Sequence, residues 1–146
     1  MPALTNIPMP PSTNHLYASI KTRGRIIRVK SQEYKSWEKE FFAWSVVYRA
    51  QIKAVKEWAL EQTSRNCTIR LDRYFWFCRS DIVCKDGTPK KLDVTNRIKA
   101  IDDAIAKLIG IDDSWYWSGY ISKNEKPFAS GENKVDLEFR DNGSVP

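Results

Sequence analysis

The chain has 146 residues, 42% of them apolar, and a formal net charge of +6. This length fits a single domain over residues 1–146, in which we expect 1–9 and 141–146 to be flexible ends. The apolar content is enough for a core and excludes a disordered chain. No apolar run approaches the roughly 18 residues of a membrane span, and the first residues lack a signal-peptide pattern. We therefore expect a cytoplasmic protein with no membrane partner.

Three cysteines and one histidine restrict the metal and redox chemistry that this chain can carry. Cys67, Cys78 and Cys84 form no CxxC pair, and His15 lies far from them in the sequence. These spacings exclude a zinc site of the usual kind. Because free cysteines bury readily, we expect Cys67 and Cys78, which flank an apolar run, to be core residues.

The first thirty residues combine prolines with positive charge. Residues 4–9, LTNIPM, fit an edge strand, and residues 26–29, IIRV, fit a short strand after a basic loop that contains Gly24. A contact with a polyanion and a solvated hairpin both explain this first basic cluster, and the sequence leaves both open. Its cations are Lys21, Arg23, Arg25, Arg28 and Lys30.

Residues 31–62 carry apolar side chains at intervals of three and four, which is the period of a helix. Ser31 is a suitable N-cap, and Glu33 is favourable in the first turn. We predict one long helix whose apolar stripe covers the core. The stripe consists of Tyr34, Trp37, Phe41, Trp44, Val47, Tyr48, Ile52, Val55, Trp58 and Ala59.

The remaining chain alternates strands with a second helix. Residues 67–78 are rich in strand-forming side chains, and residues 85–91, KDGTPKK, read as a basic loop. We predict a helix over 95–109, a strand near 115–122 and a last strand over 134–139 that a tail follows. About five strands with two main helices in this order predict an α+β fold with a mixed sheet.

The second helix has an apolar face and a compact polar stripe. Thr95 can cap its start, and Gly110 follows its end. Asn96, Lys99 and Asp103 share the polar face because they stand at positions i, i+3 and i+7. Lys99 and Asp103 fit a surface salt bridge four residues apart, and they also fit a functional site.

Carboxylates flank this helix at both ends. Asp93 precedes it, and Asp112 and Asp113 follow Gly110, where the negative end of the helix dipole makes acids slightly unfavourable. Adjacent acids without an evident structural role suggest a divalent cation. Mg²⁺ is held by one or two carboxylates with waters and phosphate oxygens, and a nearby lysine can stabilise charge on a phosphate under attack.

The order and spacing of these residues resemble the RusA-type Holliday junction resolvases, a family common in phages and prophages. The segment PPSTNHLY, the RGR at 23–25 and the helix that begins near Ser31 also resemble the start of that family. The resemblance runs from about Pro10 to Trp117. The stretch that carries it reads Asp93-Val94-Thr95-Asn96, Lys99, Asp103-Ala104 and Asp112-Asp113.

The resemblance implies a homodimeric endodeoxyribonuclease of the bacterial cytoplasm that cuts four-way DNA junctions by paired nicks. It implies Mg²⁺ as the cofactor, with Mn²⁺ as a substitute. Asp93 and Asp113 would be catalytic metal ligands, with Asp112 as a further ligand or a neighbour that tunes their pKa. Lys99 would stabilise charge, and Asn96 would position groups at the site.

One position departs from the family, because Thr95 stands where a second aspartate is expected. Three consequences of this departure are open. The site works with fewer carboxylates, Asp103 or Asp112 compensates for the missing one, or activity is weak or lost. Fourteen helical residues also span about 20 Å. Asp93 and Asp113 therefore reach one ion only if the loop folds back or a second subunit completes the site.

Cations around this stretch predict contacts to a DNA backbone, whose affinity should fall with salt. Trp115 and Trp117 fit either stacking on unpaired bases or packing within the protein. Two other functions remain open: a basic DNA-binding phage accessory protein with a weak or dead site, and a metal nuclease for flaps or forks. The cations are Arg23, Arg25, Lys85, Lys90, Lys91 and Arg97.

Overall fold

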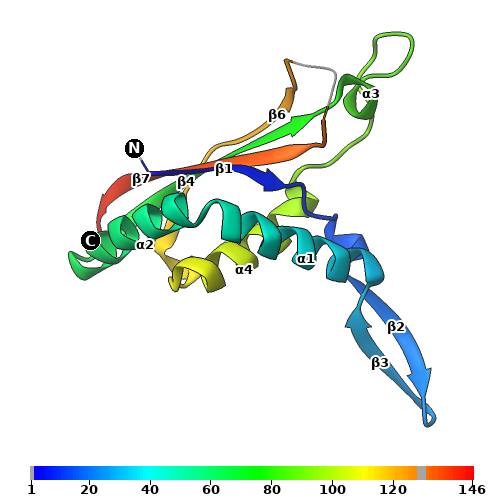
Figure 1. Cartoon of the computed structure of the whole chain (residues 1–146), viewed down its shortest axis with the longest axis horizontal. Helices are drawn as coiled ribbons and strands as arrows, with labels where there is room; N and C mark the ends of the chain where they lie inside the picture. Colours follow the sequence, from blue (N-terminus) through cyan, green and yellow to red (C-terminus); the bar gives the residue numbers. More distant parts are fainter. Residues whose placement is uncertain (1, 128–130) are drawn as a thin grey trace.

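Strand β4 (Cys67–Phe77) forms the centre of a five-stranded mixed sheet in the computed structural model, which describes residues 2–127 and 131–146. β7 (Lys134–Ser144) pairs antiparallel with β4, and β1 (Ala3–Pro8) pairs with β7 as the outer strand. β5 (Tyr116–Ser118) and β6 (Ile121–Glu125) run parallel to β4 along its other edge. The predicted α+β class with a five-stranded mixed sheet is confirmed, and residues 4–9 supply the expected edge strand (Figure 1).

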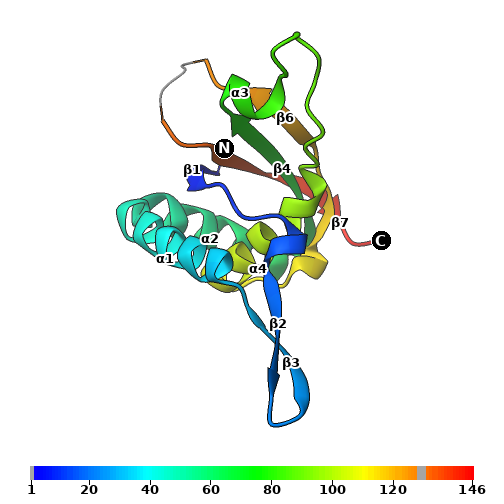
Figure 2. The ribbon, with the colours of Figure 1, turned by 90° about the vertical axis from the view of Figure 1, so that its right-hand side faces the viewer.

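Three helices, α1 (Gln32–Val47), α2 (Arg49–Ser64) and α4 (Ile98–Ile109), lie on one side of this sheet (Figures 1 and 2). Successive strand residues point to opposite sides, so alternate positions of β4 and β7 face these helices and form the core. The opposite side of the same strands carries polar side chains. The core side chains of the two strands are Ile69, Leu71, Phe75, Phe77, Val135, Leu137 and Phe139.

The predicted helix over 31–62 is two helices rather than one. Ser31 caps α1 as expected, since its Oγ accepts a hydrogen bond from the Tyr34 N–H at 3.0 Å. The direction changes at Tyr48, which has φ −97° and ψ 21°, although the Tyr48 N–H still donates to Trp44. The bend lets α1 contact β1 while α2 contacts β4. Because neither proline nor glycine marks the bend, it could not be predicted from local sequence.

The second predicted helix is confirmed as the short 3-10 turn η2 (Thr95–Arg97) followed directly by α4. Gly110 ends it with φ 72°, a left-handed conformation that glycine adopts without strain. Ile101, Ile105 and Ile109 on its predicted apolar face are fully buried. Thr95 is not the cap, because its side chain makes no capping hydrogen bond to the helix.

The strands after α4 differ from the prediction in their limits. The segment predicted near 115–122 is divided at Gly119 into β5 and β6, after the short helix η3 (Asp113–Trp115). A Cβ on Gly119 would lie 2.1 Å from the Leu71 carbonyl oxygen, so only glycine fits against β4 at this point. The last strand continues beyond 134–139, because β7 extends to Ser144, which pairs with Cys67.

Strands β2 (Tyr17–Thr22) and β3 (Arg25–Lys30) form a separate hairpin, here called the arm, which projects away from the body of the molecule (Figure 2). It follows the short helix η1 (Thr13–His15). Arg23 and Gly24 connect the strands with positive φ values of 47° and 73°. Two consecutive residues with positive φ form the tight turn that matches the twist of a hairpin.

All three cysteines are free thiols. Cys67 is buried as predicted, but Cys78 is only partly buried, so its assignment to the core is wrong. The reason is its place: Cys78 follows the last residue of β4, just before the four-residue helix α3 (Arg79–Ile82). The helix α3 lies at the end of β4, away from the middle of the sheet that the three long helices cover (Figure 1).

Candidate functional site

Asp93 lies on the surface, just before η2. Its Oδ1 accepts two hydrogen bonds from Thr95, one from the backbone N–H at 2.9 Å and one from the hydroxyl at 2.5 Å. These bonds, the hydroxyl's first, hold the pKa of Asp93 below its ordinary value. Asp93 is therefore an exposed carboxylate that is ionised at neutral pH, and it is the side chain that caps the turn.

Thr95, which stands where the resembled family has an aspartate, supports Asp93 directly. Its hydroxyl is directed to the Asp93 carboxylate. The hydrogen bond favours the ionised form of Asp93, but it also occupies one of the oxygens that a cation would use. The substitution thus replaces a second negative charge with a donor that stabilises the first.

Lys123 of β6 lies beside the Asp93 segment, although the sequence prediction omitted it. Its Nζ donates to the Leu92 carbonyl at 3.2 Å, and its positive charge further lowers the pKa of Asp93. The parallel pairing of β6 with β4 brings this lysine to the site from 31 residues away along the chain. Lys123 lies beyond the strand predicted near 115–122, and no local sequence signal marks this contact.

Lys99 and Asp103 form the predicted salt bridge on the exposed face of α4. Lys99 Nζ lies 3.2 Å from Asp103 Oδ2, and hydrogen bonding to this carboxylate raises the pKa of Lys99. Tyr17 and Tyr34 raise it further, so the pair lies near the base of the arm and the start of α1. Lys99 is therefore held by a different set of neighbours from those that surround Asp93.

Asn96 and Arg97 connect η2 to the N-terminal segment. The backbone carbonyl of Asn96 accepts a hydrogen bond from the Thr13 hydroxyl at 2.6 Å, and Arg97 donates to the Pro10 carbonyl at 2.7 Å. Arg97 is half-buried, and desolvation lowers the pKa of its guanidinium, which lies 5.9 Å from the centre of the Phe77 ring. These contacts give Arg97 a structural position that the sequence prediction of a DNA contact did not include.

Asp112 and Asp113 differ from each other in environment. Asp112 has the structural role that the sequence did not reveal, since its Oδ1 accepts the Ser114 N–H at 2.9 Å and caps η3. Hydrogen bonds from Ser114 lower the pKa of Asp112. Asp113 is exposed, and its charge raises the pKa values of Asp102 and Tyr116 nearby.

The acids that were predicted to hold a metal ion stand at opposite ends of α4. The 12 residues of this helix span about 18 Å, with Asp93 before its start and Asp113 beyond its end. Within residues 2–127 and 131–146, no group of three or more His, Cys, Asp or Glu side chains is arranged to hold a metal. At the start of α4, one chain therefore provides Asp93 as a single carboxylate ligand. Such a site suits Mg²⁺ only where water, phosphate or a second subunit supplies the other ligands.

The predicted DNA-contacting cations fall at two ends of the molecule. Arg23 and Arg25 stand at the exposed tip of the arm, and Lys90 and Lys91 are exposed on the loop between α3 and η2. In both ribbon views the arm is at one end, the α3 loop is at the other, and the segment that carries Asp93 runs between them (Figures 1 and 2).

The two tryptophans after Asp113 have separate roles. Trp115 packs against the hydrophobic core, as one of the two interpretations expected. Trp117 is 54% exposed, and its indole N–H donates to the Ser114 carbonyl at 3.0 Å. Trp117 therefore presents its ring at the surface beside the Asp112 and Asp113 turn.

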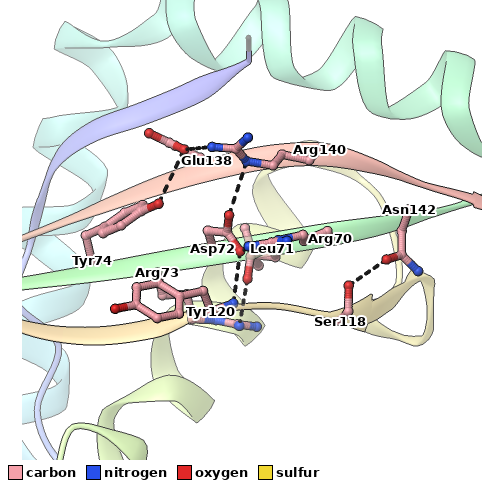
Figure 3. A network of polar contacts seen from close by, with 10 residues as sticks. All are labelled: Arg70, Leu71, Asp72, Arg73, Tyr74, Ser118, Tyr120, Glu138, Arg140 and Asn142. Atoms are coloured by element: carbon pink, nitrogen blue, oxygen red, sulfur yellow. Dashed lines mark hydrogen bonds and ion pairs between the residues drawn. The ribbon is translucent and has the colours of Figure 1, made fainter.

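A polar network that the sequence did not predict crosses the open side of the sheet (Figure 3). Its centre is Asp72, which is only 1% exposed and contacts Arg70 Nε at 2.8 Å and Arg140 Nε at 3.2 Å. The Tyr120 N–H also donates to Asp72 at 2.9 Å. Burial raises the pKa of Asp72, but these partners outweigh burial and lower it overall. The network ties β4 to β7 and to the segment between β5 and β6.

A second buried pair joins the sheet to α4 on the opposite side. Arg73 donates to both oxygens of Asp102, at 2.9 and 2.8 Å, and both side chains are largely buried. Desolvation raises the pKa of Asp102 in spite of this partner. The pair fixes α4, and with it the positions of Asp93 and Asp113, against β4.

Comparison with known proteins does not assign the chain to a family: no family model matches it, and no curated protein matches it. None of the helices in the described ranges has the length and apolar character needed to cross a membrane.

Proposed function

We propose that this protein is a metal-dependent endodeoxyribonuclease that acts as a homodimer on branched DNA, with four-way junctions as its substrate. The observation that carries the proposal is the Asp93 site. An exposed, ionised carboxylate lies beside Lys123, on a segment that connects two strongly basic ends of the molecule. A phosphodiester backbone along this segment would meet cations on both sides of a single carboxylate.

The arm supports the contact with DNA. Its residues 16–31 contain no acid, and its five cations extend from the body on a hairpin that is exposed on both sides. A projecting basic hairpin can follow the surface of a nucleic acid beyond the body of the protein, where phosphate contacts supply salt-dependent affinity. The choice of a four-way DNA junction as the substrate rests on the resemblance of residues 90–113 to RusA-type resolvases.

The apolar surface of the protein supports self-association. Ile20 and Ile27 pair across one face of the arm and are 44% and 39% exposed. On α1, Phe42 is 70% exposed and Val47 is 77% exposed. Apolar side chains left at the surface in this way favour a protein partner, and a two-fold dimer fits a substrate that is itself nearly two-fold.

A bound Mg²⁺ would stabilise charge on the phosphate under attack and supply an activated water. Asp93 of one subunit would hold the ion together with Asp113 of the other subunit. Asp112 would lie beside Asp113. Lys123 keeps the Asp93 segment in place through the Leu92 carbonyl, and Asp103 holds Lys99 near the base of the arm. Mn²⁺ would bind the same oxygen ligands.

The first test is cleavage of a labelled synthetic four-way junction with Mg²⁺, beside duplex and flap DNA of matched sequence. We expect paired symmetric nicks on the junction alone, and no nicks with Asp93→Asn. Cleavage confined to flaps or forks would favour a different metal nuclease. Tight, salt-sensitive junction binding without nicks in Mg²⁺ or Mn²⁺ would favour a DNA-binding protein in which Thr95 marks a dead site.

A second test addresses the sharing of sites between subunits. Asp93→Asn and Asp113→Asn chains are each inactive in the proposal, but a heterodimer of the two would contain one complete site. Mixing them should restore nicking of one strand. A mixture as inactive as its parents, with heterodimers demonstrated by mass spectrometry, would exclude shared sites.

A further inference from the structure

A cavity lies at the α3 end of the molecule, away from the acids discussed above. It has a volume of about 720 Å³ and is formed by α3, the loop 84–90 and the residues that follow β6. This volume suits a nucleotide-sized group, since small-molecule sites occupy about 300–1,000 Å³. The end of β4 enters it at Cys78, and Cys84 lines it from the loop.

The charge of the cavity is strongly positive. Four cations line it, Arg79, Lys85, Lys90 and Lys126, against one acid, Glu125. Glu125 is paired with Arg79, whose Nη1 lies 3.1 Å from Glu125 Oε2. Positive side chains therefore outnumber negative ones around this concave surface, and Lys85 and Lys90 both come from the loop 84–90.

The two acids nearest to this cavity in the sequence do not line it. Asp86 accepts hydrogen bonds from the Thr88 N–H and hydroxyl at 2.9 and 2.6 Å, and Asp81 accepts one from the Asn133 side chain at 2.9 Å. Because both carboxylates are held elsewhere, the positive character of the cavity is built into the loop structure.

The loop that carries the lysines is also held in shape. The Cys84 N–H donates to the Thr88 carbonyl at 2.7 Å, and the Lys90 N–H donates to the Ile82 carbonyl at 2.8 Å. Lys90 Nζ lies 2.6 Å from the Ser80 carbonyl, which fixes its ammonium group at the cavity wall. A preformed group of cations loses less conformational entropy when it binds an anion.

We propose that this cavity binds a phosphate group, and that the phosphate belongs to the DNA strand that continues to Asp93. The second part rests on the proposed function. Lys90 and Asp93 are three residues apart, so at most about 10 Å of extended chain separates them. One strand of a duplex places a phosphate every 3.4 Å along the axis. The bound phosphate would therefore lie at most about three nucleotides from the one at Asp93.

The two cavity cysteines give a direct measurement of occupancy. Alkylation of Cys78 and Cys84 by iodoacetamide, followed by mass spectrometry, can be compared with that of Cys67, which is buried elsewhere and serves as the internal control. EDTA prevents cleavage during the assay. We expect saturating junction DNA to slow alkylation of Cys78 and Cys84 at least fivefold and to leave Cys67 unchanged.

Two further arms use inorganic phosphate and a deoxynucleoside monophosphate. Protection by the monophosphate at concentrations where DNA gives none would make the ligand a free nucleotide rather than a strand. Unchanged alkylation in all three arms, while fluorescence anisotropy shows bound DNA, would overturn the cavity proposal and leave the proposed function standing. Absence of DNA binding by anisotropy would instead count against the proposed function.

A variant pair tests the same site by affinity. Lys85→Gln with Lys126→Gln removes two cavity cations, whereas Lys53→Gln with Lys56→Gln removes two cations from the exposed face of α2. We expect the first pair alone to reduce the slope of log affinity against log salt by about 1, the value for one lost phosphate contact. Equal slopes for the two pairs would contradict the proposal.

Discussion

Residues 72 and 73 of β4 point to opposite sides of the sheet, and each takes part in an Asp–Arg contact. On the open side, Asp72 is surrounded by Arg70, Arg140 and the Tyr120 N–H, and its pKa is lowered. On the covered side, Arg73 pairs with Asp102 beneath α4, and the pKa of Asp102 is raised.

The difference shows which effect dominates at each carboxylate. Asp102 receives one guanidinium, while the helix and sheet around it remove water, and desolvation exceeds the gain from the pair. Asp72 is also buried from solvent, but it lies beside two guanidinium groups and the Tyr120 N–H, and together these exceed the desolvation. The balance between positive charge at the carboxylate and the loss of water therefore sets the direction of each pKa shift.

Breaking the covered pair should give the largest effect. Arg73→Met would leave Asp102 buried without its partner, which we expect to reduce the free energy of unfolding by about 3 kcal/mol. Chemical denaturation at pH 7 measures this loss. Arg73→Met combined with Asp102→Leu should recover most of it, and a double variant as unstable as the single one would show that the charge was not the cause.

The pH dependence of the covered pair has a definite sign. Because the folded pKa of Asp102 is above its unfolded value, the folded state binds the extra proton, and stability falls as pH rises through this window. In Arg73→Met the window should widen, so acidification toward the unfolded pKa should partly restore stability. Wild-type protein measured over the same pH range is the control.

Gly119 lies between the two regions, and a side chain there should disturb both. Its added Cβ would lie 2.1 Å from the Leu71 carbonyl and 3.1 Å from Arg73 Nη1, next to the residue whose N–H binds Asp72. We expect Gly119→Ala to cost about 2 kcal/mol, since the backbone of β4 or of the β5–β6 segment must shift. Gly24→Ala on the arm, where space is open but φ is 73°, measures the cost of backbone strain without a steric clash and provides the comparison. Equal melting temperatures for wild type and Gly119→Ala would contradict the close approach.

Removing the charge on the open side should have a smaller effect. The folded pKa of Asp72 is depressed, so its stabilisation is present above the unfolded pKa and is lost as pH falls through the folded pKa. We expect Asp72→Asn to cost about 1 kcal/mol at pH 7 and to flatten the loss of stability in acid. If Asp72→Asn loses stability with falling pH as steeply as the wild type does, Asp72 is not the source of that loss.

Asp93 extends the comparison to a carboxylate with no burial. Its pKa is lowered chiefly by the Thr95 hydroxyl, so Thr95→Val should move the pKa of Asp93 toward its ordinary value and lower stability at neutral pH less than any of the changes above. Carbon-detected NMR titration of the carboxylate measures this shift. Thr88→Val, which removes the same contact from Asp86, provides a reference of known direction. An unchanged Asp93 titration would mean that the backbone N–H is sufficient.

The fold was largely predictable because local patterns control it. The period of residues 98–109, the glycine after them and the serine cap at 31 each depend on neighbours along the chain, and all are found in the structure. The bend at Tyr48 and the division of the predicted strand into β5 and β6 at Gly119 were missed, because tertiary contacts rather than local signals determine them.

The site was less predictable, because its partners are distant in sequence. Lys123 reaches the Asp93 segment only through the pairing of β6 with β4, and Asp102 meets Arg73 from 29 residues away. Spacing identified Asp93 and the Lys99–Asp103 bridge correctly as neighbours of one helix. It gave no account of Asp112, whose capping role depends on the turn that follows Gly110.

The arm also affects how the protein behaves at high concentration. Both of its strands have an outer edge that pairs with no other described strand, and one face presents Ile20 and Ile27. Open strand edges with apolar side chains are templates for aggregation, and lysines and arginines on such edges oppose it. In 1 M salt, where charges are screened beyond about 3 Å, that protection weakens. The cations that we propose as DNA contacts thus also oppose aggregation of the protein when no DNA is bound.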